Sequence, residues 1–239
     1  MKYINKRFGF LQAALVVWAS SSNASVAVFP VTSTAAFGDY QPQPSSSNIS
    51  YSVGKNVFAD QTEFAWGGRA IKSKLAFDGL AFDADTTPFE LGSLRYDNAT
   101  FLSELAISSV KLDIKLSFSG IGEKIISYDI GIDDTPNSGP GCTVNGCPDI
   151  ITITPSFNDG KLLLTTVGNT QYIFEFLGFD TAGTQNSRKF ETSEGANSTA
   201  QLFGRITTSA VPVPGAIWSF LSGSMLLAGV AAQRRREKI

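Results

Sequence analysis

Apolar and polar residues alternate in several short stretches of the chain. In "VKLDIKLSF", single polar residues separate the apolar side chains of Val110, Leu112, Ile114, Leu116 and Phe118. A β-strand points successive side chains to opposite faces, so this period of two predicts a strand with one apolar and one solvated face. The apolar face is expected to pack on a core.

The same alternation recurs between residues 49 and 208. "ISYDIGID" alternates from Ile126, "QYIFEFLGF" places Tyr172, Phe174 and Phe176 on one side, and "DIITIT" and "AQLFGRIT" are further short strands. Turn-forming residues separate these runs, and no stretch between residues 30 and 210 keeps a helical period over three turns. The pattern predicts one all-β domain over residues 49–208, an antiparallel β-sandwich or jelly roll.

The residues before this domain have the three parts of a signal peptide. Basic residues among the first seven precede an apolar run over 8–19, and small residues follow. Cleavage is expected after Ala24, with Ala27 as a second candidate, so residues 1–24 are the expected signal peptide and the protein is expected to be exported. The alternatives are an N-terminal membrane anchor or a buried helix. Residues 25–48 are rich in Ser, Thr and Pro and are expected to form a lead-in or an irregular edge.

The last part of the chain, residues 211–236, has a layout of its own. Residues 216–232 carry no charge, and as a helix they would be ~26 Å long, enough to cross a hydrocarbon core. Trp218 lies near one end, where an interfacial aromatic anchors, and Arg234, Arg235 and Arg236 at the other end would stay cytoplasmic. The pattern predicts a single transmembrane helix; the alternative is a buried core helix.

Composition narrows the possible chemistry. The chain has no histidine, which excludes Ser-His-Asp triads, Cys-His pairs and histidine metal sites. Its formal net charge is −2, without the basic stripe of a nucleic-acid-binding protein. Cys142 and Cys147 lie in the loop "GPGCTVNGCPD", where a disulfide is expected in an oxidising compartment; two free thiols are the alternative.

Two acidic loops and one tryptophan are the remaining candidates for a site in the domain. Calcium takes six to eight oxygen ligands, and loops with Asp83 and Asp85, or with Asp129, Asp133 and Asp134, could supply them; solvated turns at strand ends are the favoured interpretation. Trp66 is interpreted as a core residue, with a sugar-stacking platform as the alternative. We therefore predict no catalytic residue, no cofactor and no metal.

Asparagines form a further set of candidates for modification. Asn48, Asn98 and Asn197 each begin an Asn-x-Ser/Thr triplet, and their loops are expected to be exposed.

The end of the chain resembles the PEP-CTERM sorting signal of Gram-negative bacteria. The matching residues are Val211, Pro212, Pro214, Ala216, Trp218, Arg234, Arg235 and Arg236. Val213 stands where the signal's name-giving Glu occurs, as in Val-Pro-Leu-Pro-Ala variants. The resemblance implies an exosortase as partner, the inner membrane as a transient anchor, and delivery to the cell surface or extracellular matrix.

The central region is similar to the choice-of-anchor K domain, a family of exported bacterial β-domains. "FAWGG", "PFELGSLRYDNAT", "GCPDIITI", "YIFEFLGF" and "FETSEGANSTAQLFGRIT" follow in the expected order over about residues 56–207. A related PEP-CTERM group carries Thr-His-x-Asn, and the missing histidine argues against it. The resemblance implies an extracellular, matrix-associated role and no characterised catalytic residue.

Two functions follow from these observations. The first is a structural or adhesive protein of the cell surface or matrix that is not an enzyme, with extracellular polysaccharide as a candidate partner. The alternative is a carbohydrate-binding module or a weak glycan-active enzyme delivered by the same route. Exposed aromatic rings on a concave face would favour glycan binding, whereas a polar outer face with buried aromatics would favour the structural role.

Overall fold

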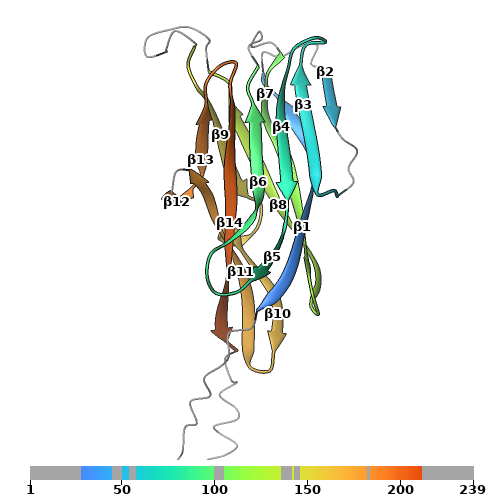
Figure 1. Ribbon diagram of the computed structural model, residues 1–239, viewed down its shortest axis with the longest axis vertical. Helices are drawn as coiled ribbons and strands as arrows, with labels where there is room; N and C mark the ends of the chain where they lie inside the picture. The colour runs from blue at the N-terminus through green and yellow to red at the C-terminus, as the bar shows by residue number, and fades with distance from the viewer. Residues whose placement is uncertain are drawn as a thin grey trace, which may run out of the picture.

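Two antiparallel sheets form the fold, as seen in the computed structural model (Figure 1). It describes residues 28–44, 50–53, 58–99, 105–135, 142, 146–181 and 184–211. The first sheet has six strands in the order β13 (Lys189–Thr192), β9 (Asp149–Pro155), β8 (Gly122–Asp133), β7 (Ile107–Phe118), β1 (Phe29–Pro42) and β5 (Ala81–Ala84). Consecutive strands β7, β8 and β9 form a meander within it.

The second sheet has eight strands. Seven follow the order β10 (Lys161–Val167), β11 (Thr170–Thr181), β14 (Asn197–Ala210), β6 (Phe89–Asp97), β4 (Lys72–Gly79), β3 (Gln61–Gly67) and β2 (Ser50–Val53). The eighth, β12 (Thr184–Ser187), pairs with β11. A short 3₁₀ turn, η2 (Asn158–Gly160), precedes β10. The predicted all-β class and antiparallel sandwich are therefore confirmed.

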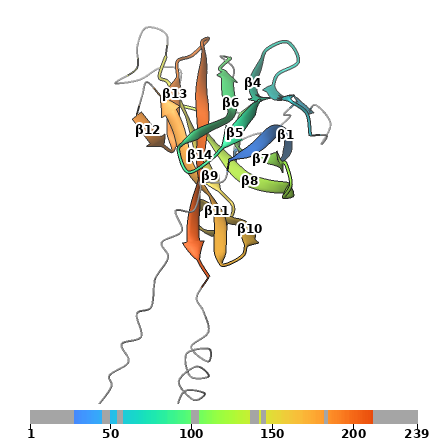
Figure 2. The same cartoon turned by 60° about the horizontal axis from the view of Figure 1, so that its bottom comes forward.

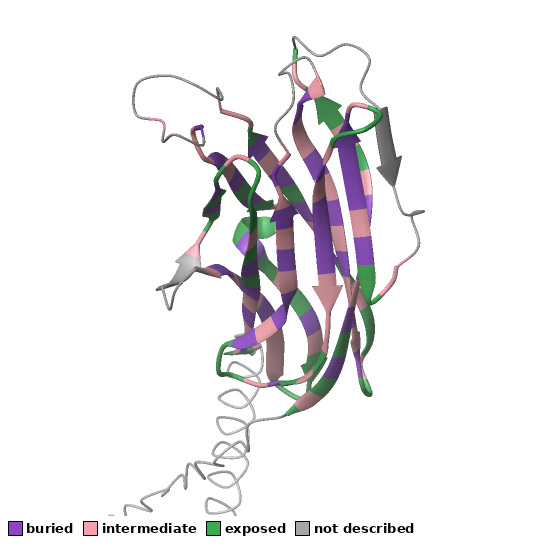
Figure 3. Ribbon diagram, turned by 45° about the horizontal axis from the view of Figure 1, so that its top comes forward, coloured by how far each residue is buried: buried purple, intermediate pink, exposed green. Residues whose placement is uncertain are grey.

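One apolar core lies between the two sheets and is rich in aromatic rings. Phe37 on β1 packs against Phe64 on β3, with ring centroids 6.2 Å apart. On another pair of facing strands, the ring centroids of Tyr128 on β8 and Phe176 on β11 lie 4.7 Å apart. Rings contributed by both sheets therefore hold the sheets face to face. Figure 3 shows the resulting alternation of buried and less buried residues along the strands.

The strands predicted from alternation are present. On β7, the five predicted inward side chains, Val110, Leu112, Ile114, Leu116 and Phe118, are buried. Phe174 and Phe176 on β11 belong to the same core, and Tyr172 packs against it. The period of two predicted these strands because each has one face on the core and one toward solvent.

The expected lead-in is wrong over residues 29–42, which form β1. This strand lies inside the first sheet, between β7 and β5, so the domain begins about twenty residues earlier than the predicted residue 49. Small or weakly apolar residues such as Ser33, Ala35 and Ala36 fill its buried positions. Ser33 is satisfied there because its hydroxyl donates to the Leu91 carbonyl over 2.6 Å.

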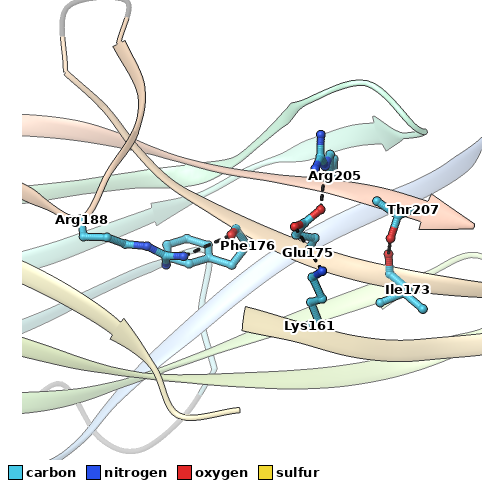
Figure 4. Close-up of polar contacts among 7 residues, drawn as sticks. All are labelled: Lys161, Ile173, Glu175, Phe176, Arg188, Arg205 and Thr207. Atoms are coloured by element: carbon cyan, nitrogen blue, oxygen red, sulfur yellow. Dashed lines mark hydrogen bonds and ion pairs between the residues drawn. The ribbon is translucent and has the colours of Figure 1, made fainter. Parts of the chain in front are cut away.

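Charged pairs between strands occupy the outer face of the second sheet (Figure 4). Glu175 on β11 accepts a hydrogen bond from Arg205 on β14 over 2.7 Å and lies 3.7 Å from Lys161 on β10. The hydrogen bond from Arg205 lowers the pKa of Glu175. Arg188 instead contacts the buried, inward-facing ring of Phe176, 4.6 Å from its centre, and donates to that residue's carbonyl. The outward positions that Lys161, Glu175 and Arg205 occupy on three neighbouring strands are thus charged.

Two predicted segments lie outside the described residues: the signal peptide over 1–24 and the transmembrane helix over 216–232. Within the described residues, no helix has the length and apolar character needed to cross a membrane.

Candidate functional site

Three carboxylates from separate parts of the chain meet at one end of the sandwich. Asp134 directly follows β8, Asp149 is the first residue of β9, and Glu194 lies in the turn between β13 and β14. Because β9 pairs with both β8 and β13, the ends of these strands are adjacent. Carboxylate oxygens of the three residues lie within 4.8 Å of one another. These three residues are called the acidic cluster below.

The acidic cluster lies far from the point where the strands lead into the C-terminal segment. β14 begins at Asn197, three residues after Glu194, and ends at Ala210. At about 3.3 Å per residue, its 14 residues span about 45 Å. Figures 1 and 2 show that the end of β14 lies beside the β10–β11 hairpin, at the opposite end from β13.

Both sheets hold the Asp149 side chain in place. The Tyr96 hydroxyl, on β6 of the second sheet, donates to Asp149 Oδ2 over 2.8 Å, and the Thr135 amide donates to Oδ1 over 3.0 Å. Asp149 is only 1% exposed. Burial raises the pKa of Asp149 to about 6, although the hydrogen bonds from Thr135 and Tyr96 lower it. The ring of Tyr96 is itself fixed by stacking on Trp66.

Asp134 is half-buried and has an unsatisfied oxygen. Its Oδ2 atom is buried and has no hydrogen-bond partner among the described residues. Burial, together with the charges of Asp149, Glu194 and Asp133, raises the pKa of Asp134 to about 7. No described Lys or Arg forms an ion pair with Asp134 or Asp149. Within the described part of the chain, no cation therefore compensates the negative charge of these two carboxylates.

A buried threonine hydroxyl lies next to the acidic cluster. Thr192 lies directly opposite Asp149 in the β13–β9 ladder, and opposite residues in an antiparallel pair share one face with Cβ atoms about 5 Å apart. Thr192 is 1% exposed, and its Oγ1 atom has no hydrogen-bond partner among the described residues. Its carbonyl accepts a hydrogen bond from Asn98 Nδ2 over 3.3 Å. The cluster thus has an unpartnered, buried oxygen beside Asp149.

The predicted disulfide is confirmed and belongs to the same end of the molecule. Cys142 and Cys147 are bonded to each other in the connection from β8 to β9. That connection begins with Asp134 and leads into Asp149. The disulfide therefore shortens the free chain between two members of the acidic cluster.

The predicted acidic loops do not form sites as groups. Asp83 is exposed, and Asp85 accepts hydrogen bonds from the Thr87 amide and hydroxyl, which lower its pKa. Asp129 and Asp133 are exposed. Of these five residues, only Asp134 joins the acidic cluster, because the alternation along β8 turns the other two of its group outward.

Sequence reasoning missed Asp149, Glu194 and Thr192 because strands distant along the chain bring them together. One local signal was available for Asp149. It shares the inward face of β9 with Ile151 and Ile153, so a period of two places an acid at a core position. An ionisable residue in an apolar register is a signal of a buried polar network.

The other predicted site residues have mixed outcomes. Trp66 is 1% exposed, which confirms the core interpretation, whereas Asn98 is 5% exposed, so its expected exposure is wrong. Val211 donates its amide to the Asn169 carbonyl over 2.8 Å. The rest of the predicted sorting signal, Pro212, Val213, Pro214, Ala216, Trp218, Arg234, Arg235 and Arg236, lies outside the described residues.

Comparisons with known proteins add no identification. No family model matches the chain, and a search of curated proteins finds no significant match. The resemblances to the PEP-CTERM signal and the choice-of-anchor K domain therefore stay hypotheses.

Proposed function

We propose that this chain is an exported bacterial protein of structural or adhesive type, sorted through residues 211–236 to the cell surface or extracellular matrix. The expected signal peptide supports export, and the Pro-rich, apolar and Arg-rich parts of the C-terminal segment support sorting by an exosortase. The disulfide between Cys142 and Cys147 fits an oxidising compartment. Catalysis is not part of the proposal.

The observation that favours a structural role is the placement of the aromatic side chains. Every aromatic side chain that the structure describes is buried or half-buried. Trp66, the best candidate for stacking on a sugar, is enclosed between Phe64 and Tyr96. Stacking on a sugar needs an exposed ring, so this arrangement supports the structural or adhesive role over a carbohydrate-binding module that uses aromatic stacking. Extracellular polysaccharide remains a proposed partner through polar contacts.

The direction of β14 suggests how the domain would be presented. The strand ends at Ala210, immediately before the proposed signal, and begins about 45 Å away, beside the acidic cluster. While residues 216–232 anchor the precursor, the cluster end would project away from the inner membrane. Contacts with matrix components would then occur at that distal end.

A proline substitution experiment tests the sorting step. Proline fixes φ and lacks an amide donor, so Pro212 and Pro214 keep their stretch extended and unpaired, as a protease cleft requires. In a host with an exosortase, the Pro212→Ala/Pro214→Ala double variant should stay in the membrane fraction at full length. The Thr208→Ala/Ser209→Ala double variant, at exposed positions just before the proposed signal, is the matched control and should be released like the parent.

Two outcomes of this experiment would contradict the proposal. The first is release of the double proline variant as efficiently as the parent. The second is equal release of the parent from a strain that lacks the exosortase.

A further inference from the structure

Two members of the acidic cluster, Asp134 and Asp149, form no ion pair with a described Lys or Arg. Like charges close together repel, and partial burial strengthens the repulsion because the local dielectric constant is low. Asp134, Asp149 and Glu194 approach within 4.8 Å. Their charges can be relieved by protonation at low pH or by a bound cation at neutral pH.

We propose that the acidic cluster binds one calcium ion, with carboxylate oxygens of Asp134, Asp149 and Glu194 as ligands. Every candidate ligand atom is an oxygen, which hard cations prefer. The chain has no histidine, and its two cysteines are bonded to each other, so nitrogen and sulfur ligands for zinc are lacking. The class of ligand is therefore a hard divalent cation.

The spacing of the oxygens matches the size of a calcium site. Calcium–oxygen distances are about 2.3–2.6 Å, so ligands on opposite sides of the ion lie about 4.6–5.2 Å apart. The oxygens of the cluster lie within 4.8 Å of one another, close enough to bind one such ion together. The three ligands come from a strand start and two connections, an irregular arrangement that calcium tolerates better than the strictly octahedral magnesium ion.

Thr192 Oγ1, an unpartnered oxygen outside the acidic cluster, points independently to a ligand. This oxygen is buried beside Asp149 and has no hydrogen-bond partner among the described residues. Asp134 Oδ2 is also buried and also lacks such a partner. Buried polar atoms without partners are rare, since each costs about 1–3 kcal/mol. A cation at the cluster would satisfy Asp134 Oδ2 directly and would bring a hydrated partner, or a direct bond, to Thr192.

Hydrogen bonds prepare Asp149 for this role. Thr135 donates from its amide and its hydroxyl to Oδ1, whereas Tyr96 alone donates to Oδ2, so Oδ2 keeps a further lone pair for a cation. Tyr96 and Thr135 are therefore positioning residues for a ligand. The inference stands apart from the proposed export, because binding can be measured on the isolated protein.

Calorimetry on the full chain, kept soluble in mild detergent and freed of metal with EDTA, tests the proposal. Calcium chloride should bind with a stoichiometry of about one per chain, and at about 100 times Kd it should raise the Tm by about 5–10 °C. Asp134→Asn should weaken binding at least about tenfold, because affinity depends on ligand charge. Asp133→Asn, its exposed neighbour, is the matched control and should change Kd by less than about threefold.

Two measurements distinguish a loss of calcium binding from a loss of folding in the ligand variants. Asp134→Asn removes a repelling charge, so in chelator its Tm should be no lower than that of the parent. Glu194→Gln in the β13–β14 turn is a second ligand variant and should show the same loss of binding. The proposal is overturned by the absence of saturable binding up to about 10 mM calcium, above the about 10⁻⁴–10⁻³ M of extracellular modules. It is also overturned if magnesium binds more tightly than calcium. A third contrary result is an equal loss of calcium affinity in the Asp134→Asn and Asp133→Asn variants.

Discussion

Replacing Ile114 by aspartate should unfold the domain, because this side chain lies at the centre of the core. Ile114 is fully buried on β7, opposite Ala35 of β1 and Ile126 of β8. Losing the burial of the isoleucine costs about 1.5–3 kcal/mol. Placing an unpaired carboxyl group there costs several kcal/mol more. The sum is comparable with the whole stability of a typical domain, about 5–15 kcal/mol.

A graded variant and an exposed control isolate the effect of burial. Ile114→Ala should cost about 2–5 kcal/mol and lower the Tm by about 5–20 °C. Ile125 lies on the neighbouring strand β8, faces outward and is 54% exposed. Ile125→Ala and Ile125→Asp should therefore change the free energy of unfolding by only about 0.5 kcal/mol.

Circular dichroism during heating and urea unfolding measures these differences. The reasoning is refuted if Ile114→Asp melts like the parent, or if Ile125→Asp is as damaging as Ile114→Asp. Either result would mean that the inward face of the β7–β8 pair has been assigned to the wrong residues.

Three further predictions follow from particular residues. Non-reducing mass spectrometry of exported protein should find the peptides of Cys142 and Cys147 linked, and two free thiols would contradict the proposed compartment. In chelator, the free energy of unfolding should fall as pH rises from about 4 to about 7, because the native pKa of Asp134, about 7, exceeds its ordinary value of 3.8 and the native state binds more protons in this window. Asp134→Asn should reduce that slope in denaturant titrations, and an unchanged slope would contradict the assignment. Gly92→Ala should cost about 1–3 kcal/mol in the same assay, because Gly92 has φ +146° and an added Cβ would lie 2.5 Å from Phe77 Cζ; parent-like stability would show that β6 can adjust.

The sequence predicted those strands whose two faces differ clearly in polarity. β7 and β11 alternate large apolar residues with charged ones, so their period is visible without a structure. β1 was missed because Ser33 and Ala35 occupy buried positions where small residues fit against the second sheet. The Ser-, Thr- and Pro-rich composition suggested a solvated segment. Residues 29–42 instead form a strand because they pair with β5 and β7.

The acidic cluster could not be predicted from spacing. Asp134, Asp149 and Glu194 lie in three connections or strand ends, and only the order β8–β9–β13 makes them neighbours. The local disulfide was predictable because four residues separate its cysteines in a Gly- and Pro-rich loop. Predicting a site that forms between neighbouring strands requires the strand order and the pairing register. A single sequence does not reveal either of them.

The intact mass of protein recovered from the cell surface or medium of a host with an exosortase tests the central proposal most directly. The account predicts a chain that begins after Ala24 or Ala27, both of which precede β1, and that lacks its last ~25 residues, a length that follows from the motif and the membrane span. A mass that retains the C-terminal segment through Arg236 in surface or released protein would contradict it.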